Sequence, residues 1–193
     1  MIYFRTQSQN ILVSGFKTDQ IDDESVAKVA DLGIARTDDR DPHADLAHTE
    51  GYVAKRNCSH AITRRVVGTG PYMPPEYRNM GHVSAKTDAF ALGIVIFELL
   101  ISGAIKTEYP EAFPVAARGL VDSEDVDTLS GTVLAMATKG GWAGGNGLLA
   151  AKVLTDIAIS FTRVTSKRQT PAQVLPQLET AYHTYAGGGT MSL

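Results

Sequence analysis

The sequence predicts a mainly α-helical domain with one small β-hairpin near its beginning. Residues 88–100 are apolar on nearly every side, which is typical of a helix that is buried all round. A second helix with one apolar face is expected after Gly147. Two short apolar runs, 11–13 and 26–30, predict the strands of the hairpin. The 193 residues, 44% of them hydrophobic, suffice for one core, so a single domain is expected.

Composition excludes several classes of function. The formal net charge of −3 offers no broad basic surface, which argues against binding to nucleic acid. Cys58 is the only cysteine, so neither an internal disulfide nor a multi-thiolate metal site can form, and a reducing, cytoplasmic compartment is expected. No signal peptide is recognisable, and the longest apolar run, 89–101, contains Glu98. We therefore expect no membrane segment, although the chain could be the intracellular part of a longer protein.

The segments around the hairpin look irregular. Residues 16–25, between the two strands, are polar and without periodicity, which predicts a solvated loop. Residues 35–65 mix Asp, His, Arg and Thr with no sustained apolar period. Composition alone predicts a long, mobile loop there.

The central helix carries recognisable end signals. Ser84 is expected to cap its start, and Gly103 to serve as the glycine just after its end. The glycine-rich residues 140–147 then predict a flexible connection. They do not resemble a phosphate-binding loop, because no strand precedes them and no Lys-Ser/Thr pair follows.

Two helices are expected in the last third of the chain. For the final helix, Thr170, Pro171 and Gln173 form the pattern of a cap, a first-turn proline and a capping partner. Pro176 predicts either a kink or a later start, and residues 187–193 a disordered tail. The residues expected on the packed faces are Ala150, Leu154, Ile157, Ala158 and Phe161 in the first helix, and Leu175, Leu178, Tyr182 and Tyr185 in the second.

Five short stretches, in order along the chain, resemble motifs of eukaryotic-type Ser/Thr protein kinases. Residues 10–13 and 27–33 resemble the end of the catalytic loop and the D-F-G motif, and residues 67–76 the G-T-x-x-Y-M-x-P-E stretch that closes the activation segment. Residues 86–93 resemble the start of the central helix, and 167–170 the Arg before the last helix. The resemblance is to the receptor-like branch and implies the helical C-terminal lobe of a kinase domain, over residues 1–186, with an activation segment at 31–76.

The resemblance implies a metal and nucleotide site. Asn10 and Asp31 stand where the family places its Mg²⁺ ligands beside ATP, and an amide and a carboxylate oxygen suit that ion. The plainer alternative makes Asp31-Leu32-Gly33 an ordinary turn after a strand.

Four further residues match structural or positioning residues of the family. Glu76 and Arg168 would form a buried ion pair, whereas exposed surface charges are the alternative. Asp88 would accept hydrogen bonds from catalytic-loop amides; alternatively, it is only a carboxylate near the helix start that interacts favourably with the helix dipole. Thr69 matches the threonine that contacts the catalytic Asp.

The sequence departs from the family at the catalytic base. Counting back from Asn10 places Arg5 at the base position, and a guanidinium cannot accept a proton at physiological pH. Gln7 replaces the usual Lys. Since the residues before Asn10 could supply only about one strand, the N-lobe is expected to be absent, and binding of ATP and Mg²⁺ by this chain alone is doubtful.

Other candidate sites carry less weight. A zinc site from His43, His48, Cys58 and His60 lacks the close ligand pairs of such sites. Thr49 and Thr63 lie where activation loops are phosphorylated, but for each of them an ordinary polar loop residue is the favoured interpretation.

Three hypotheses about function follow. The chain is a fragment of a kinase domain for ATP-dependent phosphorylation of protein Ser/Thr, inactive as it stands, with a truncated or misassigned start at residues 1–7. Alternatively, it is a non-catalytic, pseudokinase-like module that binds a protein partner. A third idea is that the lobe does not fold stably alone, because apolar surface would be exposed.

Overall fold

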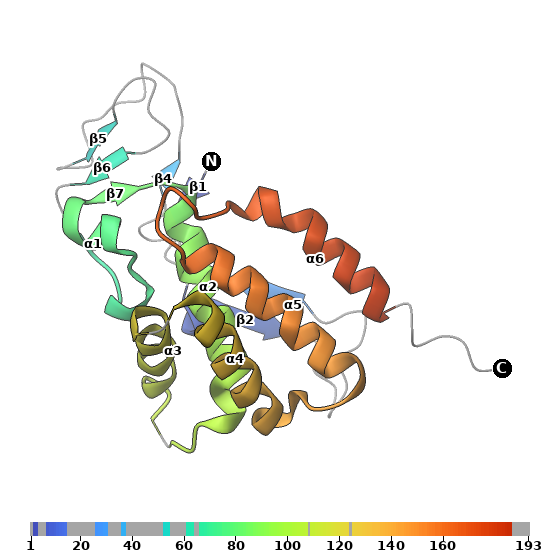
Figure 1. Ribbon diagram of the computed structural model, residues 1–193. Helices are drawn as coiled ribbons and strands as arrows, with labels where there is room; N and C mark the ends of the chain where they lie inside the picture. Colours follow the sequence, from blue (N-terminus) through green and yellow to red (C-terminus); the bar gives the residue numbers. More distant parts are fainter. Residues whose placement is uncertain are drawn as a thin grey trace.

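The computed structural model is mostly helical, with several separate, small antiparallel sheets (Figure 1). It describes residues 2–3, 7–14, 26–30, 36–37, 52–54, 61–63, 66–107, 109–123 and 125–186.

Helix α2 (Ala85–Ile101) forms the centre of the core. It packs against α3 (Ala112–Ser123), α4 (Val126–Ala137) and α5 (Gly145–Thr162), which lie around it in Figure 1. The prediction of a buried central helix is therefore confirmed. Gly93 allows α2 and α5 to approach, because a Cβ there would lie 2.8 Å from Thr162 Cγ2 and 3.0 Å from Phe161 Cβ. The fully buried large side chains of α2 are Phe90, Ile94, Phe97, Leu100 and Ile101.

The start of α2 matches the prediction, and its end matches in position but not in backbone geometry. The Lys86 N–H donates to Ser84 Oγ at 3.2 Å, and the Ser84 N–H donates to Thr87 Oγ1 at 3.0 Å, so a capping box closes the first turn. The helix ends at Ile101 and continues into the 3₁₀ turn η4 (Ser102–Ala104). Gly103 follows the Ser102 cap just after the helix end, as predicted, but it lies inside this turn without a positive φ and so does not form a left-handed glycine cap.

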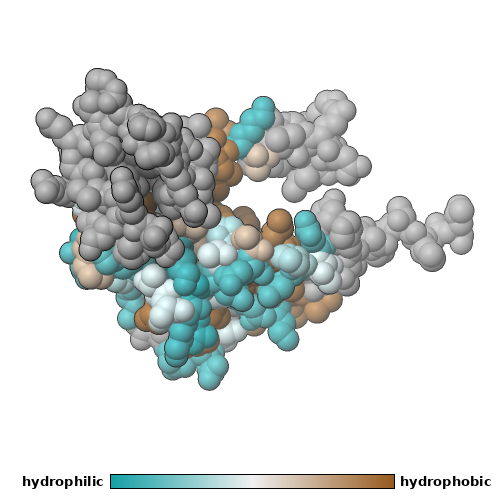
Figure 2. Space-filling model, turned by 90° about the horizontal axis from the view of Figure 1, so that it is seen from above, coloured by the Kyte–Doolittle hydropathy of each residue, from teal (hydrophilic) through white to brown (hydrophobic). Residues whose placement is uncertain are grey.

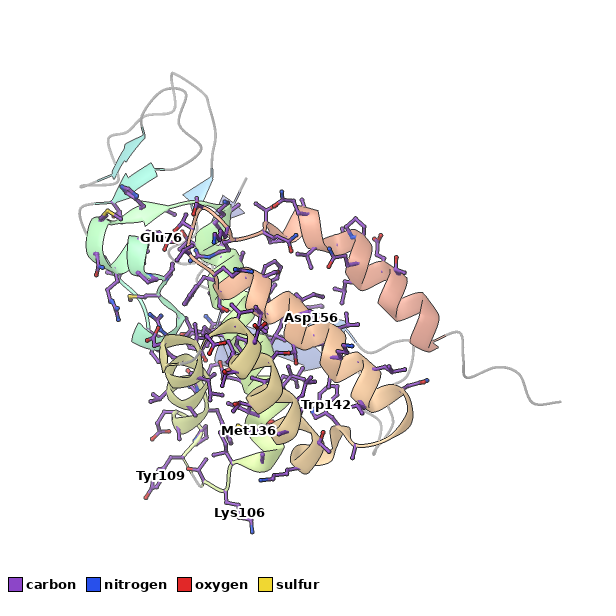
Figure 3. All side chains as sticks on the ribbon, viewed as in Figure 1. Glu76, Lys106, Tyr109, Met136, Trp142 and Asp156 are labelled. Atoms are coloured by element: carbon purple, nitrogen blue, oxygen red, sulfur yellow. The ribbon has the colours of Figure 1, made fainter. Side chains whose placement is uncertain are left out.

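The glycine-rich stretch is structured. Residues Thr138–Trp142 form a π-helical turn, η5, that continues α4, and α5 begins at Gly145. A Cβ on Gly103 would lie 2.3 Å from the Gly140 carbonyl oxygen, so two glycines let η4 and η5 touch. Trp142, labelled in Figure 3, packs on the core. The expected flexible connection is thus corrected to a packed turn.

Helices α3 and α4 occupy a region for which the sequence analysis expected no element. Asp125 caps α4, since its Oδ1 accepts hydrogen bonds from the N–H groups of Asp127 at 3.0 Å and Thr128 at 3.1 Å. Leu129 and Val133 of α4 and Ala117 of α3 are buried in the core around α2.

The expected hairpin is present. Strand β2 (Ile11–Ser14) pairs antiparallel with β3 (Val26–Val29), with Ile11 opposite Val29. Residues 35–65, expected to form only a mobile loop, contain three short strands: β4 (Arg36–Thr37), β5 (Tyr52–Ala54) and β6 (Ala61–Thr63). Strand β4 pairs with β1 (Ile2–Tyr3). Strand β6 pairs with both β5 and β7 (His82–Val83) to form a sheet. Strands of two or three residues are too short to leave a periodic pattern, so the prediction failed there. Residues 16–25 lie outside the described part.

The last helix, α6 (Pro171–Ala186), begins as predicted. The Thr170 N–H donates to Gln173 Oε1 at 2.8 Å, and the Gln173 N–H donates to the Thr170 carbonyl at 3.0 Å. Pro176 lies inside the helix. The expected packed face is corrected, because Leu175 and Leu178 are 52% and 42% exposed. Val174 instead packs on Ala89, Ile157 and Phe161. The side chains of Tyr182 and Tyr185 and the tail 187–193 lie outside the described part.

The face of α5 agrees with the prediction. Ile157, Ala158 and Phe161 are buried, and Ala150 and Leu154 are partly buried. Small and branched apolar residues at helical spacing therefore placed this helix correctly against the core.

One described stretch, Ala85–Ala104, is long and apolar enough to cross a membrane by length and composition alone. Half of it is buried inside the structure, and it contains the central helix α2. A buried core helix meets the same criterion.

On the face drawn in Figure 2, hydrophilic residues in teal interrupt the hydrophobic ones in brown.

Candidate functional site

The first part of the site lies where β2 begins. Asn10 ends the 3₁₀ turn η1 (Ser8–Asn10) and is buried. Its N–H donates to the Gln7 carbonyl at 3.0 Å, and its own carbonyl accepts from the Ala30 N–H at 2.7 Å. Ala30, the residue that precedes Asp31, therefore lies beside Asn10. Asp31 itself is outside the described part, so the structure describes only one of the two expected metal ligands.

Thr69 contacts the position that the resemblance assigns to a lysine. Its hydroxyl donates to Gln7 Oε1 at 2.8 Å, in an exposed position just before the 3₁₀ turn η3 (Gly70–Tyr72). Arg5, at the expected base position, lies outside the described part. The hydroxyl expected to contact a catalytic carboxylate is thus hydrogen-bonded to a neutral amide.

A buried polar network lies behind this contact. The Ser8 hydroxyl donates to Glu98 Oε2 at 2.9 Å and lies 3.1 Å from the Tyr72 hydroxyl. Within the described part of the chain, Glu98 Oε1 is buried without a hydrogen-bond partner. Burial raises the pKa of the Glu98 carboxyl and raises the pKa of Tyr72 to about 12. The network joins α2 to both chain segments of the site.

No sequence motif assigned this network a role. Its signal was a single acidic residue, Glu98, within an otherwise apolar buried helix. A carboxylate at such a position is costly unless it is paired, protonated or functional.

The structure brings Glu76 and Arg168 together in a buried ion pair. Arg168 Nη1 donates to Glu76 Oε1, and Nη2 lies 3.4 Å from Oε2. Arg168 also donates to the carbonyls of Lys86 at 2.9 Å and Arg163 at 3.0 Å. Glu76, labelled in Figure 3, belongs to α1 (Pro75–Met80). The pair therefore ties α1 to the segment between α5 and α6.

A second buried guanidinium holds the same region. Arg118 of α3 donates to the Met73 carbonyl at 2.6 Å and the Pro71 carbonyl at 3.3 Å, while its Nε donates to Asp122 Oδ2 at 2.7 Å. The guanidinium carbons of Arg118 and Arg168 lie 5.0 and 4.9 Å from the centre of the Phe90 ring. Sequence reasoning missed Arg118, since no motif surrounds it.

The remaining candidates are less informative. Asp88 lies partly buried in the first turn of α2, where the helix dipole favours a carboxylate. Thr63 lies in β6, and its N–H donates to the Gly81 carbonyl at 2.9 Å. Thr49 and the zinc candidates His43, His48, Cys58 and His60 are outside the described part. Among the described residues, no group of three or more His, Cys, Asp or Glu side chains could hold a metal ion.

Comparison with known proteins finds similarity to plant protein kinases. No protein-family model matches the chain. Cysteine-rich receptor-like protein kinase 27 of Arabidopsis thaliana is 35% identical over 80 residues, which are 42% of this chain and 10% of that protein. Probable serine/threonine-protein kinase PBL11 of the same plant is 31% identical over 124 residues, 63% of this chain and 27% of that protein. Chitin elicitor receptor kinase 1 of Physcomitrium patens is 35% identical over 103 residues, which are 51% of this chain and 13% of that protein.

The matches cover only part of the relatives. The chain matches 10%, 27% and 13% of the length of these three proteins. Roughly half of the chain is thus similar to a small portion of each larger protein.

Proposed function

Since the chain is a homologue, over about half of its length, of plant receptor-like and related Ser/Thr protein kinases, we propose that residues 1–186 are the helical lobe of a protein kinase domain. Residues 31–76 are its activation segment. In an intact domain this lobe takes part in ATP-dependent transfer of phosphate to Ser or Thr of a protein substrate. We propose the cytoplasm as its compartment, in line with its single cysteine.

The ion pair between Glu76 and Arg168 carries the proposal. It is buried, and it joins the end of the expected activation segment to the segment before the last helix. Breaking a buried pair leaves an uncompensated charge, so such a pair holds its two segments firmly together. Arg118 adds hydrogen bonds to the carbonyls of Pro71 and Met73. This supports a lobe that positions the residues after Thr69.

The donor chemistry near β2 fits Mg²⁺. Asn10 supplies an amide oxygen, and Asp31 would supply a carboxylate, both hard oxygen ligands. The hydrogen bond from Ala30 to the Asn10 carbonyl supports their proximity. When bound, Mg-ATP supplies the phosphoryl group that is transferred.

We further propose that this chain does not catalyse the transfer by itself. Arg5 stands at the base position, and a guanidinium stays protonated and cannot accept the substrate proton. The contact between Thr69 and Gln7 supports this view, because the neutral amide of Gln7 stands where the resemblance places a Lys.

The same contact favours a second candidate, a pseudokinase-like module that binds a protein partner without catalysis. The two candidates differ in nucleotide binding. A folded state that binds Mg-ATP gains stability by mass action, whereas a pure binding module gains none.

Phosphoryl transfer and thermal melting test both candidates. We expect the full chain, incubated with radiolabelled Mg-ATP and casein, to transfer no phosphate above the level of an Asp31→Ala control. Transfer that this substitution abolishes would show that the chain is an active kinase. A rise in melting temperature with Mg-ATP, absent in Asp31→Ala, would reject the pure binding module. Sequencing the full transcript shows whether a His-Arg-Asp loop lies upstream in frame.

A further inference from the structure

A cavity of about 300 Å³ opens between α1, the C-terminal part of α3 and the segment that follows α5. It is separate from the contact between Gln7 and Thr69 and from the hairpin, since no residue of either lines it. Its base is formed by Phe90 and by the ion pair of Glu76 with Arg168.

The base of the cavity is held from several sides. Phe90 is 1% exposed. Arg168 is fixed by Glu76, by two carbonyls and by its position over the Phe90 ring. A base fixed in this way exists before any ligand arrives, which lowers the entropic cost of binding.

The charges around the cavity leave one cation uncompensated. Of the two acidic residues that line it, Glu76 is paired with Arg168, and Asp122 with Arg118 at 2.7 Å. Arg163 also lines the cavity and is exposed, and within the described part of the chain it has no side-chain partner. The cavity therefore complements a ligand with one negative charge.

The remaining lining suits a peptide. Met80 and Val164 are 56% and 65% exposed at the cavity, and Val121 is partly buried there. Asn79 also lines it and is exposed. An asparagine amide offers both a donor and an acceptor, which matches the N–H and carbonyl of an extended peptide.

We propose that this cavity binds a short, extended segment of a partner protein in which an apolar side chain is next to Asp or Glu. The apolar side chain packs against Met80, Val121 and Val164, the carboxylate pairs with Arg163, and the peptide backbone bonds to Asn79. This binding goes beyond the proposed function, because it requires neither nucleotide nor phosphoryl transfer.

An array of immobilised peptides tests the proposal with the full chain. Each peptide carries one apolar residue, taken in turn from Leu, Ile, Val, Met and Phe, followed by Glu, with matched sets that have Gln or Lys instead. We expect binding to the Glu set, and about fivefold weaker binding to the Gln set, which is the upper range for one exposed ion pair. Binding to no set, or equally to all three, overturns the proposal.

Charge reversal supplies the decisive control. The Arg163→Glu variant is expected to lose binding to the Glu peptides and to bind the Lys peptides instead. Lys167→Glu makes the same change of charge at an exposed position that does not line the cavity, and it should bind as the unaltered chain does. Equal effects of the two variants overturn the proposal, as does sedimentation showing that a second copy of the chain fills the site. Equal melting temperatures of the two variants and the unaltered chain exclude a folding defect.

Discussion

At the scale of single residues, buried charges organise this protein. Phe90 has two guanidiniums near its ring, and each of these has a carboxylate partner. Removing charges from water is costly, and only pairing and hydrogen bonds offset that cost. The region between Pro71 and Glu76 is therefore held by arginines that come from α3 and from the segment before α6.

Loss of one partner in the Glu76–Arg168 pair should destabilise the fold strongly. We expect Arg168→Ala to lower the free energy of unfolding by about 3–5 kcal/mol, because it leaves Glu76 buried without a counter-charge. Urea denaturation followed by circular dichroism measures this. Lys167→Ala, at an exposed neighbour, should change the value by less than about 0.5 kcal/mol. Similar losses in both variants would contradict a specific role of the pair.

The sequence indicated some of these residues and missed others for physical reasons. Glu76 and Arg168 lie in short motifs, so their pairing could be expected before the structure was known. Arg118 lies in no motif, and its contacts with Pro71 and Met73 join residues far apart in sequence. The contact of Thr69 with Gln7 also depends on folding, because no local pattern brings the two together.

Glu98 should make stability depend on pH. Burial raises the pKa of its carboxyl above the unfolded value, so the folded state holds the proton more tightly. Its contribution is complete below the ordinary glutamate pKa and is lost as the pH rises through the folded pKa. We expect Glu98→Gln to remove this decline. Urea denaturation from pH 4 upward, with exposed Glu179→Gln as control, checks it, and parallel profiles of Glu98→Gln and the unaltered chain would contradict it.

At the scale of helices and strands, local signals predicted starts better than ends. Ser84 caps α2, and the Gln173 side chain accepts from the Thr170 N–H at the start of α6, because such contacts depend on residues only two or three apart. Helix α4 could have been found from Asp125 followed by Leu129 and Val133 at helical spacing. The need for a glycine at position 103 could not be predicted, because it comes from the close backbone of Gly140, far along the chain.

The contact between these two glycines gives a test. Gly103→Ala would place a Cβ 2.3 Å from the Gly140 carbonyl oxygen, so we expect a loss of about 1–3 kcal/mol in the free energy of unfolding. Gly131→Ala is the matched control, since its Cβ would meet nothing within 4 Å inside α4. It should stabilise by up to about 1 kcal/mol through helix propensity. Denaturation curves of the two variants must therefore shift in opposite directions, and a shift in the same direction would argue against this contact.

At the scale of the whole molecule, the helices differ in how deeply they belong to the core. Helix α2 is buried along most of its length and packs closely with α5 through Gly93. Helix α6 contacts this core through Val174, while its other described side chains are exposed. It also contains Pro176, which cannot donate a backbone hydrogen bond.

This difference should appear in native-state hydrogen exchange. We expect the amides of α2 and α5 to exchange only through global unfolding, because opening either helix exposes the core. Amides of residues 177–180 should exchange earlier, through local opening, with a rate that depends little on low concentrations of urea. Pro176→Ala restores the missing donor and should slow that local exchange without changing exchange in α2. Equal protection of α2 and α6 in the unaltered chain would mean that α6 unfolds only together with the core.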